Sequence, residues 1–273
     1  MPFPTDVKIT ANGATPTISW TLNGYTPDSL RVNIFDKADR IGGNLYAYAV
    51  NDLARPEDLL SVVAHYEVMA RKLGIELRLG TEVHAKFMRS VPHRYDVCVV
   101  AAGAHIDRRR FAHVEGAERM LDALDVAHGR VQTGQRVVVV GGGKVGLTLA
   151  ESLRKNRGAE VTVIEADKRI AGDVKPSFKW RHSAWIEELG IACLTGRQLL
   201  AVDAAGVTVK DAKGHESRIA ADSVVLAAGV AAAHELLHEF EWMVDELHGI
   251  GDALVPRGLE QAIQDGFRLG VRL

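Results

Sequence analysis

The sequence predicts an α/β fold made of two Rossmann-like domains, each built on a parallel sheet, with the first domain incomplete. A strand, a glycine-rich turn and a helix follow one another in the middle of the chain. Two stretches that are expected to be buried strands, 97–100 and 222–226, each lead into a small-residue turn, Ala101-Ala102-Gly103 and Ala227-Ala228-Gly229. One such unit per half indicates two related domains of alternating strands and helices. The first thirty residues instead alternate as in a β-hairpin.

The stretch 136–165 predicts a dinucleotide site. Residues 137–140 are all valine, as expected for a strand buried on both faces of a parallel sheet. Gly141, Gly143 and Gly146 follow at G-x-G-x-x-G spacing. In this pattern the first glycine permits a tight turn, the second lets the backbone approach a pyrophosphate, and the third lets the helix pack close to the strand.

The helix after the turn predicts where the phosphates bind. Lys144 and Val145 lie in its first turn, where free N–H groups and the helix dipole attract anions. Glu165 ends the next strand, nineteen residues after Gly146. A carboxylate there accepts hydrogen bonds from ribose hydroxyls and repels a 2′-phosphate, so NAD(H) is favoured over NADP(H). Arg169 lies nearby in the sequence and leaves NADP(H) open as the alternative.

Composition narrows the class of protein. The 273 residues are 47% hydrophobic and carry a formal net charge of −2, which argues against nucleic acid as the main partner. No stretch approaches the ~20 apolar residues of a membrane span, and the N-terminus has no signal-peptide pattern, so a cytoplasmic location is expected. The two cysteines, Cys98 and Cys193, form no C-x-x-C pair. No histidine spacing predicts a metal site.

The remaining elements follow from periodicity and turn signals. Ile18, Trp20 and Leu22 alternate with polar residues, and turn signals at 23–24 and 27–28 precede a strand at 30–35. Apolar stripes predict helices at 56–73 and 178–189. Further strands are expected at 75–79, 83–87, 191–194, 207–209 and 217–219, the last two as an antiparallel pair.

Several of these segments resemble one known family. The sequence NIFDKADRIGGNL, with Asp36, Gly42 and Gly43, and the tail with Gly251 and Asp252 look like parts of the FAD domain of two-dinucleotide-binding flavoproteins of the glutathione-reductase type. The closest likeness is to the C-terminal half of the NADH:flavin oxidoreductases that include 2,4-dienoyl-CoA reductase and trimethylamine dehydrogenase. The resemblance implies that Asp36 holds the adenosine ribose of FAD. It also implies that Gly251 and Asp252 face its ribityl or pyrophosphate part.

The same resemblance implies further cofactor contacts and a domain division. It implies that the backbone passes close to a dinucleotide at two turns, one with Ala102 and Gly103 and the other with Gly229. The FAD-type domain is expected at 1–133 and 230–273, and the NAD(H)-binding domain at 134–229.

One part of the family pattern is missing. The family opens its FAD domain with a strand, its own G-x-G-x-x-G and a helix, and this chain has VKITANGATPTISWTLNGYTPDSL in that place. FAD would lose charge-assisted hydrogen bonds worth about 1.5–3 kcal/mol each. We therefore expect weak FAD binding unless another chain supplies the missing element.

The sequence thus indicates an NADH-dependent flavin oxidoreductase module whose residues bind cofactors, with no catalytic acid or base. A flavoenzyme barrel domain or subunit is the partner that the resemblance implies. The alternatives are a non-catalytic subunit that holds NAD or ADP, and a truncated domain of a multidomain flavoenzyme.

Overall fold

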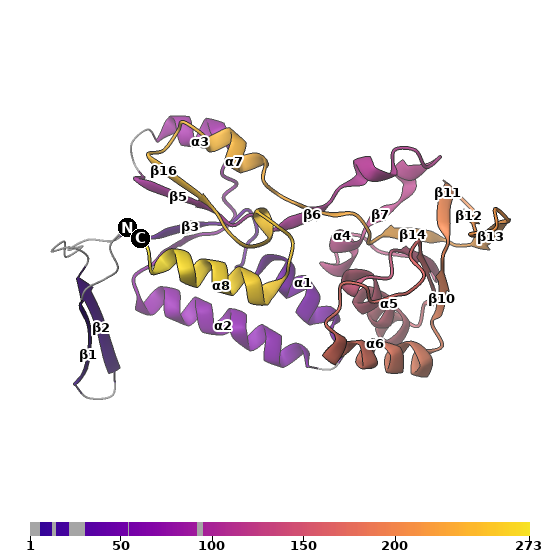
Figure 1. Ribbon diagram of the computed structural model, residues 1–273, viewed down its shortest axis with the longest axis horizontal. Coiled ribbons are helices and arrows are strands. Elements are labelled where there is room, and N and C mark those ends of the chain that lie inside the picture. The colour runs from indigo at the N-terminus through magenta and orange to yellow at the C-terminus, as the bar shows by residue number, and fades with distance from the viewer. Residues whose placement is uncertain (1–5, 13–14, 22–30, 54, 92–94) are drawn as a thin grey trace.

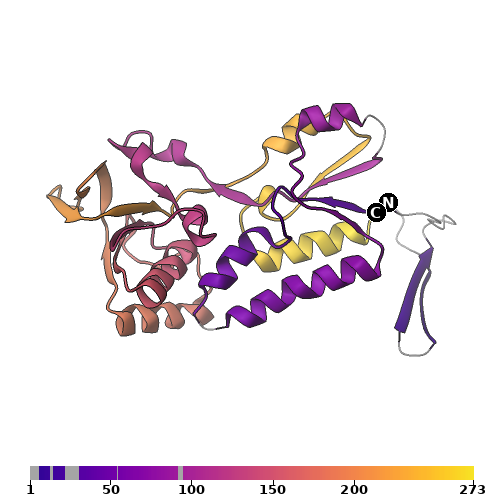
Figure 2. The ribbon, with the colours of Figure 1, turned by 180° about the vertical axis from the view of Figure 1, so that it is seen from behind.

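The computed structural model describes residues 6–12, 15–21, 31–53, 55–91 and 95–273. Two lobes lie side by side along the long axis (Figures 1 and 2). The first lobe contains residues 31–53, 55–91, 95–103 and 233–273, and the second contains residues 107–229. Strands β6 (Ala104–Ile106) and β15 (Val230–Ala232) pair antiparallel where the chain passes between the lobes.

The second lobe is built on a five-stranded sheet in the order β10-β9-β8-β14-β7, in which every pair is parallel. Its strands are β7 (Leu121–Asp122), β8 (Arg136–Val140), β9 (Glu160–Glu165), β10 (Ala192–Thr195) and β14 (Ser223–Leu226). Its helices are α4 (Ala123–Ala127), α5 (Lys144–Arg157) and α6 (Pro176–Leu189). Two short 3₁₀ helices precede this sheet in the chain, η1 (Arg108–Phe111) and η2 (Ala117–Arg119).

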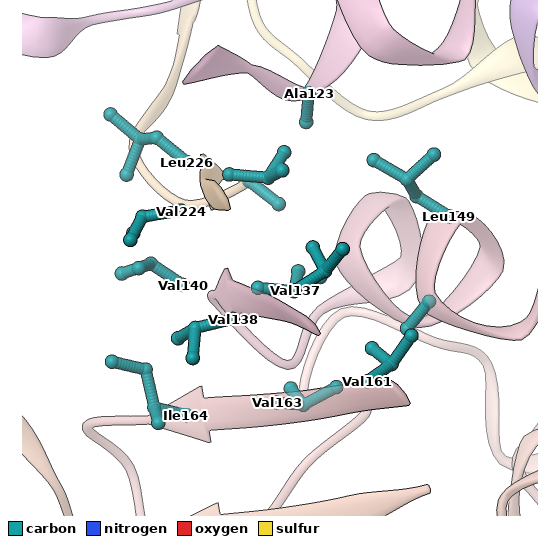
Figure 3. Close-up of a cluster of buried hydrophobic side chains, with 14 of the residues drawn as sticks. Ala123, Val137, Val138, Val140, Leu149, Val161, Val163, Ile164, Val224 and Leu226 are labelled. Atoms are coloured by element: carbon teal, nitrogen blue, oxygen red, sulfur yellow. The ribbon is translucent and has the colours of Figure 1, made fainter. Parts of the chain in front are cut away.

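The main core of the described residues lies between this sheet and its helices (Figure 3). The valines of β8 are almost fully buried, as the unbroken β-branched run predicts. Val161 and Val163 of β9 and Leu149 of α5 pack around them. A small antiparallel sheet adjoins this core and has the order β11 (Gln198–Asp203), β12 (Gly206–Lys210), β13 (Glu216–Ala220).

The first lobe contains two separate parallel ribbons. Strand β3 (Asn33–Phe35) pairs with β4 (Glu76–Arg78), and β5 (Val97–Val100) pairs with β16 (Glu246–Gly249). The surrounding helices are α1 (Gly43–Asn51), α2 (Pro56–Lys72), α3 (Ala85–Ser90), α7 (Glu235–Phe240), η3 (Gly251–Ala253) and α8 (Leu259–Gly270).

The structure confirms the α/β fold class with its Rossmann-like parallel sheet, but it corrects one strand. The segment 83–87, predicted as a strand, enters helix α3 instead. The ring Nδ1 of His84 accepts a hydrogen bond from the Phe87 backbone N–H at 3.1 Å. A side-chain cap of this kind satisfies a free N–H at the helix start and overrides the weak strand pattern.

The N-terminal hairpin is present with a different pairing. Strands β1 (Asp6–Asn12) and β2 (Thr15–Thr21) pair antiparallel with each other. The predicted turns at 23–24 and 27–28 lie outside the described residues. Within the described part of the chain, no helix has both the length and the apolar character needed to cross a lipid bilayer.

Candidate functional site

The turn between β8 and α5 has the geometry that the glycine spacing predicts. Gly141 has φ +112°, a conformation that residues with a β-carbon rarely adopt. A β-carbon on Gly146 would lie 2.0 Å from the carbonyl oxygen of Gly141. Both positions therefore require glycine, and the first turn of α5 packs directly against the end of β8.

Glu165 lies at the end of β9 beside this turn. Its Oε2 accepts a hydrogen bond from the Gly142 N–H at 2.7 Å, and its Oε1 accepts one from the Asp167 N–H at 2.9 Å. Each carboxylate oxygen has a second lone pair, so both can still accept from ribose hydroxyls. The two backbone contacts hold the carboxylate in place, as expected for a group that orients a ligand.

A hollow of ≈ 220 Å³ opens next to Glu165. Its lining includes Gly141, Ile164, Glu165, Ala166, Arg197 and Gln198. The backbone N–H of Arg197 donates to the Glu165 carbonyl at 2.9 Å, and its guanidinium pairs with Asp211 at 3.3 Å. The structure therefore brings Arg197 to the hollow and leaves Arg169 exposed outside its lining. Arg197 was missed because it follows β10, far along the chain from the fingerprint.

Asp173 is a second residue that the sequence did not indicate. Its Oδ1 accepts a hydrogen bond at 2.8 Å from the Lys144 N–H at the start of α5. A β-carbon on Gly143 would lie 3.0 Å from its Oδ2. The exposed carboxylate thus occupies the helix N-terminus, where a pyrophosphate would be attracted. An acid eight residues after the end of β9 carries no recognisable local signal.

We expect Asp173→Asn to tighten NADH binding. The amide keeps an acceptor for the Lys144 N–H but removes a negative charge that competes with the phosphates. A charge at a helix terminus contributes about 0.3–1 kcal/mol, so Kd should fall roughly two- to fivefold. Calorimetric titration at low and high salt measures Kd, and the difference in Kd between variant and parent should shrink as salt screens the charge. Asp245→Asn, a matched exposed change in the first lobe, should leave Kd unaltered; weaker binding by the Asp173 variant would contradict this role.

The side chain of Lys144 bridges the lobes. Its Nζ lies 4.5 Å from the centre of the Tyr48 ring on α1. Enclosure between the lobes lowers the pKa of Lys144 through desolvation, while the nearby Asp173 carboxylate acts in the opposite direction. Val145 packs against the core of the second lobe. Both residues were predicted to contact the cofactor. The backbone N–H of Lys144 lies at the turn, whereas the side chain of Val145 packs against the core.

Two further contacts fix the orientation of the lobes. The guanidinium of Arg181 on α6 pairs at 3.1 Å with Asp52, whose side chain is only 5% exposed. Asn51, at the end of α1, donates from its amide to the Ala127 carbonyl at 2.9 Å. Asp52 is buried and Arg181 is half-buried, so separating the lobes would deprive the buried carboxylate of this cation.

Asp36 follows β3 as Glu165 ends β9. Its Oδ1 accepts a hydrogen bond from the Ala38 N–H at 2.9 Å, and its backbone oxygen accepts one from Thr81 at 2.8 Å. Gly42 is the N-cap of α1 and Gly43 its first residue. The predicted FAD loop thus leads from the end of a parallel strand into a helix N-terminus.

The other predicted residues surround the ends of β5 and β16. Ala102 and Gly103 follow β5, and the Asn44 amide of α1 donates to the next carbonyl, Ala104, at 3.0 Å. Gly251 follows β16 and is buried. The Oδ1 of Asp252 accepts from the N–H groups of Arg257 and Gly258 at 2.8 and 2.9 Å, which shapes the loop before α8. Gly229 follows β14 at the end of the second sheet.

These residues fit the two dinucleotides to different extents. The second lobe has the turn, the helix N-terminus and the acid that a dinucleotide needs. The first lobe has the acid and the small-residue turn. However, its described residues contain no glycine turn between a central strand and a helix, so they do not provide the same phosphate cradle.

Residues 43–253 match the model of the pyridine nucleotide-disulphide oxidoreductases. This chain belongs to that family. Its members bind FAD and NAD(P), so NAD(H) and FAD are confirmed as the cofactors at the level of the family. Cys98 and Cys193 lie on β5 and β10 as free thiols, and burial raises the pKa of each. The chain therefore has no C-x-x-C dithiol of its own to serve the disulphide chemistry in the family's name.

Individual relatives are longer than this chain. The chain is 29% identical to the metal reductase of Desulforamulus reducens, over 89% of this chain and 40% of that protein. It is 30% identical to the NADH oxidase of Thermoanaerobacter brockii, over 74% of this chain and 31% of that protein. A solved complex of 2-naphthoyl-CoA reductase with 2-naphthoyl-CoA matches with a TM-score of 0.81 and 31% identity, over 89% of this chain and 36% of that one. The chain thus spans well under half of each.

Proposed function

We propose that the chain is the NADH-binding module of a flavin oxidoreductase of the 2,4-dienoyl-CoA reductase and trimethylamine dehydrogenase type. The observation that supports it most is the pairing of Glu165 with the backbone of the Gly141–Gly146 turn. NADH, when bound, supplies a hydride to a flavin. The residues of this chain bind and orient it, and the proposed domains are 134–229 for NAD(H) and 1–133 with 230–273 for FAD.

Each part of NADH has a proposed contact. The N–H groups of Gly143 and Lys144 would bind the pyrophosphate after Asp173 moves aside. Glu165 would accept from the adenosine ribose, and Arg197 would lie beside the adenine in the hollow. The nicotinamide end would lie toward the first lobe, near the contact between Lys144 and Tyr48.

A second candidate is a nucleotide-binding subunit without turnover. The observation that favours it is the lack of a phosphate cradle among the described residues of the first lobe. Purified protein with a flavin absorption band near roughly 450 nm, bleached by NADH, would support the oxidoreductase. Colourless protein that binds NAD or ADP would support the subunit.

The test is a titration of the full chain with NADH, NADPH, FAD and ADP, repeated for Glu165→Ala. Hydrogen bonds to a charged group are worth about 1.5–3 kcal/mol, so the Kd of NADH should rise roughly tenfold or more. The Kd of NADPH should rise less, because the variant also removes the repulsion between the Glu165 carboxylate and the 2′-phosphate. If the variant keeps the parent's ratio of NADH affinity to NADPH affinity, Glu165 does not contact the ribose. If the parent chain binds no dinucleotide at all, the proposal is refuted.

A further inference from the structure

The N-terminal hairpin is amphipathic in its observed register. Its pairs alternate between polar partners and apolar partners along the whole ribbon. The apolar pairs are Val7–Trp20, Ile9–Ile18 and Ala11–Pro16. Residues that pair directly lie on the same face of an antiparallel ribbon, and successive residues of a strand alternate between the two faces. The register therefore places the apolar positions of both strands together on one face.

This hairpin has no second layer to pack against. Both views show β1 and β2 standing apart from the two lobes (Figures 1 and 2). A two-stranded hairpin is at best marginally stable alone in water, and it gains stability when its apolar face packs against a helix. The apolar face of the hairpin therefore requires a helix whose own apolar side is uncovered.

Helix α8 has such a side. Among the described residues it is the only α-helix that contains no buried residue. Leu259, Ile263 and Phe267 follow one another at intervals of four, and they are 36%, 43% and 71% exposed. Another side of α8 packs on the lobe, because a β-carbon on Gly251 would lie 3.1 Å from the β-carbon of Ala262. An apolar stripe, residues 259, 263 and 267, thus runs along the outer part of α8.

The hairpin and the stripe match in size. Each strand of the hairpin has seven residues and extends over about 20 Å. Helix α8 has twelve residues and extends over about 18 Å. Two strands about 5 Å apart are about as wide as one helix with its side chains, roughly 10 Å. One ribbon can therefore cover the stripe over its whole length.

We propose that the hairpin, residues 6–21, packs its apolar face on the stripe of α8 in the same chain. Residues 22–32, eleven in all, link β2 to β3. A link of this length spans up to about 36 Å, which is about twice the length of α8. It also keeps the hairpin at an effective concentration of about 1 mM, which favours α8 of the same chain over α8 of a second copy. The position of the hairpin in Figures 1 and 2 is then the undocked one.

A disulfide tests this contact. Ile18 lies in the middle of β2, and Ile263 in the middle of the stripe, so the two meet whichever way the ribbon runs along the helix. The double variant Ile18→Cys with Ile263→Cys should form a disulfide within one chain under mild oxidation. Thr17→Cys with Ile263→Cys places the first thiol on the polar face and should crosslink about fivefold less. Non-reducing gels and peptide mass spectrometry measure the products, with the parent's Cys98 and Cys193 as background.

Two outcomes of the crosslinking would overturn the proposal. Equal yields from the two double variants would show that the hairpin does not present its apolar face to α8. A disulfide found only between two chains would assign the stripe to the hairpin of a second copy.

Hydrogen exchange tests the same contact without a new thiol. Ile18→Lys and Phe267→Lys should each speed exchange of the α8 amides about fivefold or more, because the helix loses the layer that protects it. Gln264→Lys, at an exposed polar position of α8, should leave the exchange rates unchanged. Unchanged rates in both the Ile18 and the Phe267 variants would contradict the docking. Both measurements are made without NADH, so their outcome is independent of the proposed function.

Discussion

Gly146→Val should weaken NADH binding by roughly a hundredfold. A β-carbon at position 146 would lie 2.0 Å from the Gly141 carbonyl oxygen, which is backbone and cannot rotate away. The turn must open, so the N–H groups of Gly143 and Lys144 lose their common direction. Loss of two charge-assisted hydrogen bonds at about 1.5 kcal/mol each raises Kd by roughly a hundredfold. Isothermal calorimetry measures the affinity.

The control for this prediction is Gly270→Ala, whose new β-carbon has no neighbour within 4 Å. It should bind NADH as the parent does. Gly146→Val should also lower the free energy of unfolding by about 1–3 kcal/mol, as overpacking usually does. A folded Gly146→Val protein with parental affinity would place the phosphates elsewhere.

His182→Ala should cause the largest loss of stability, about 3–5 kcal/mol in the free energy of unfolding. His182 on α6 is 1% exposed, and its Nδ1 lies 2.7 Å from the Oε1 of Glu151 on α5. Burial raises the pKa of Glu151, and the hydrogen bond to His182 acts in the opposite direction. Truncation leaves the carboxyl group buried without this partner. Urea denaturation followed by circular dichroism measures the loss.

A double-mutant cycle tests whether the pair is the cause. Glu151→Leu should be strongly destabilising alone, whereas Glu151→Leu with His182→Leu should recover much of the loss, because apolar side chains can replace a buried hydrogen-bonded pair. His215→Ala on the exposed surface should change stability by less than about 0.5 kcal/mol. Simple additivity of the two leucine changes would show that the residues do not act as a pair.

Patterns confined to a short stretch were predicted correctly. The valine run of β8, the glycines of the turn and the acid that ends β9 form one continuous unit, and each of them constrains its own backbone. Helix α2 likewise begins at Pro56, as predicted, because proline suits the first helical turn. The prediction of a strand at 83–87 was wrong because five residues are too few for the hydrophobic pattern to distinguish a strand from a capped helix.

Residues that act across the fold were missed. Asp173 and Arg197 come from loops after β9 and β10, and only the folding of both loops over the same sheet edge brings them to the turn. Arg181 and Asp52 form their ion pair across 129 positions of sequence. His182 pairs with Glu151 across 31 positions of sequence because α5 and α6 pack together. The predicted domain division and cofactor contacts of the first lobe stay predictions.

The sequence alone determined that a glycine turn joins a buried strand to a helix at 141–146 and that an acid ends the next strand at 165, because glycine spacing and strand periodicity are local backbone constraints. Only the tertiary structure decided which acid lies on the helix N-terminus, which arginine enters the hollow, and that β3 and β5 lie in separate sheets. These depend on strand order and burial, which arise when segments far apart in the chain pack together.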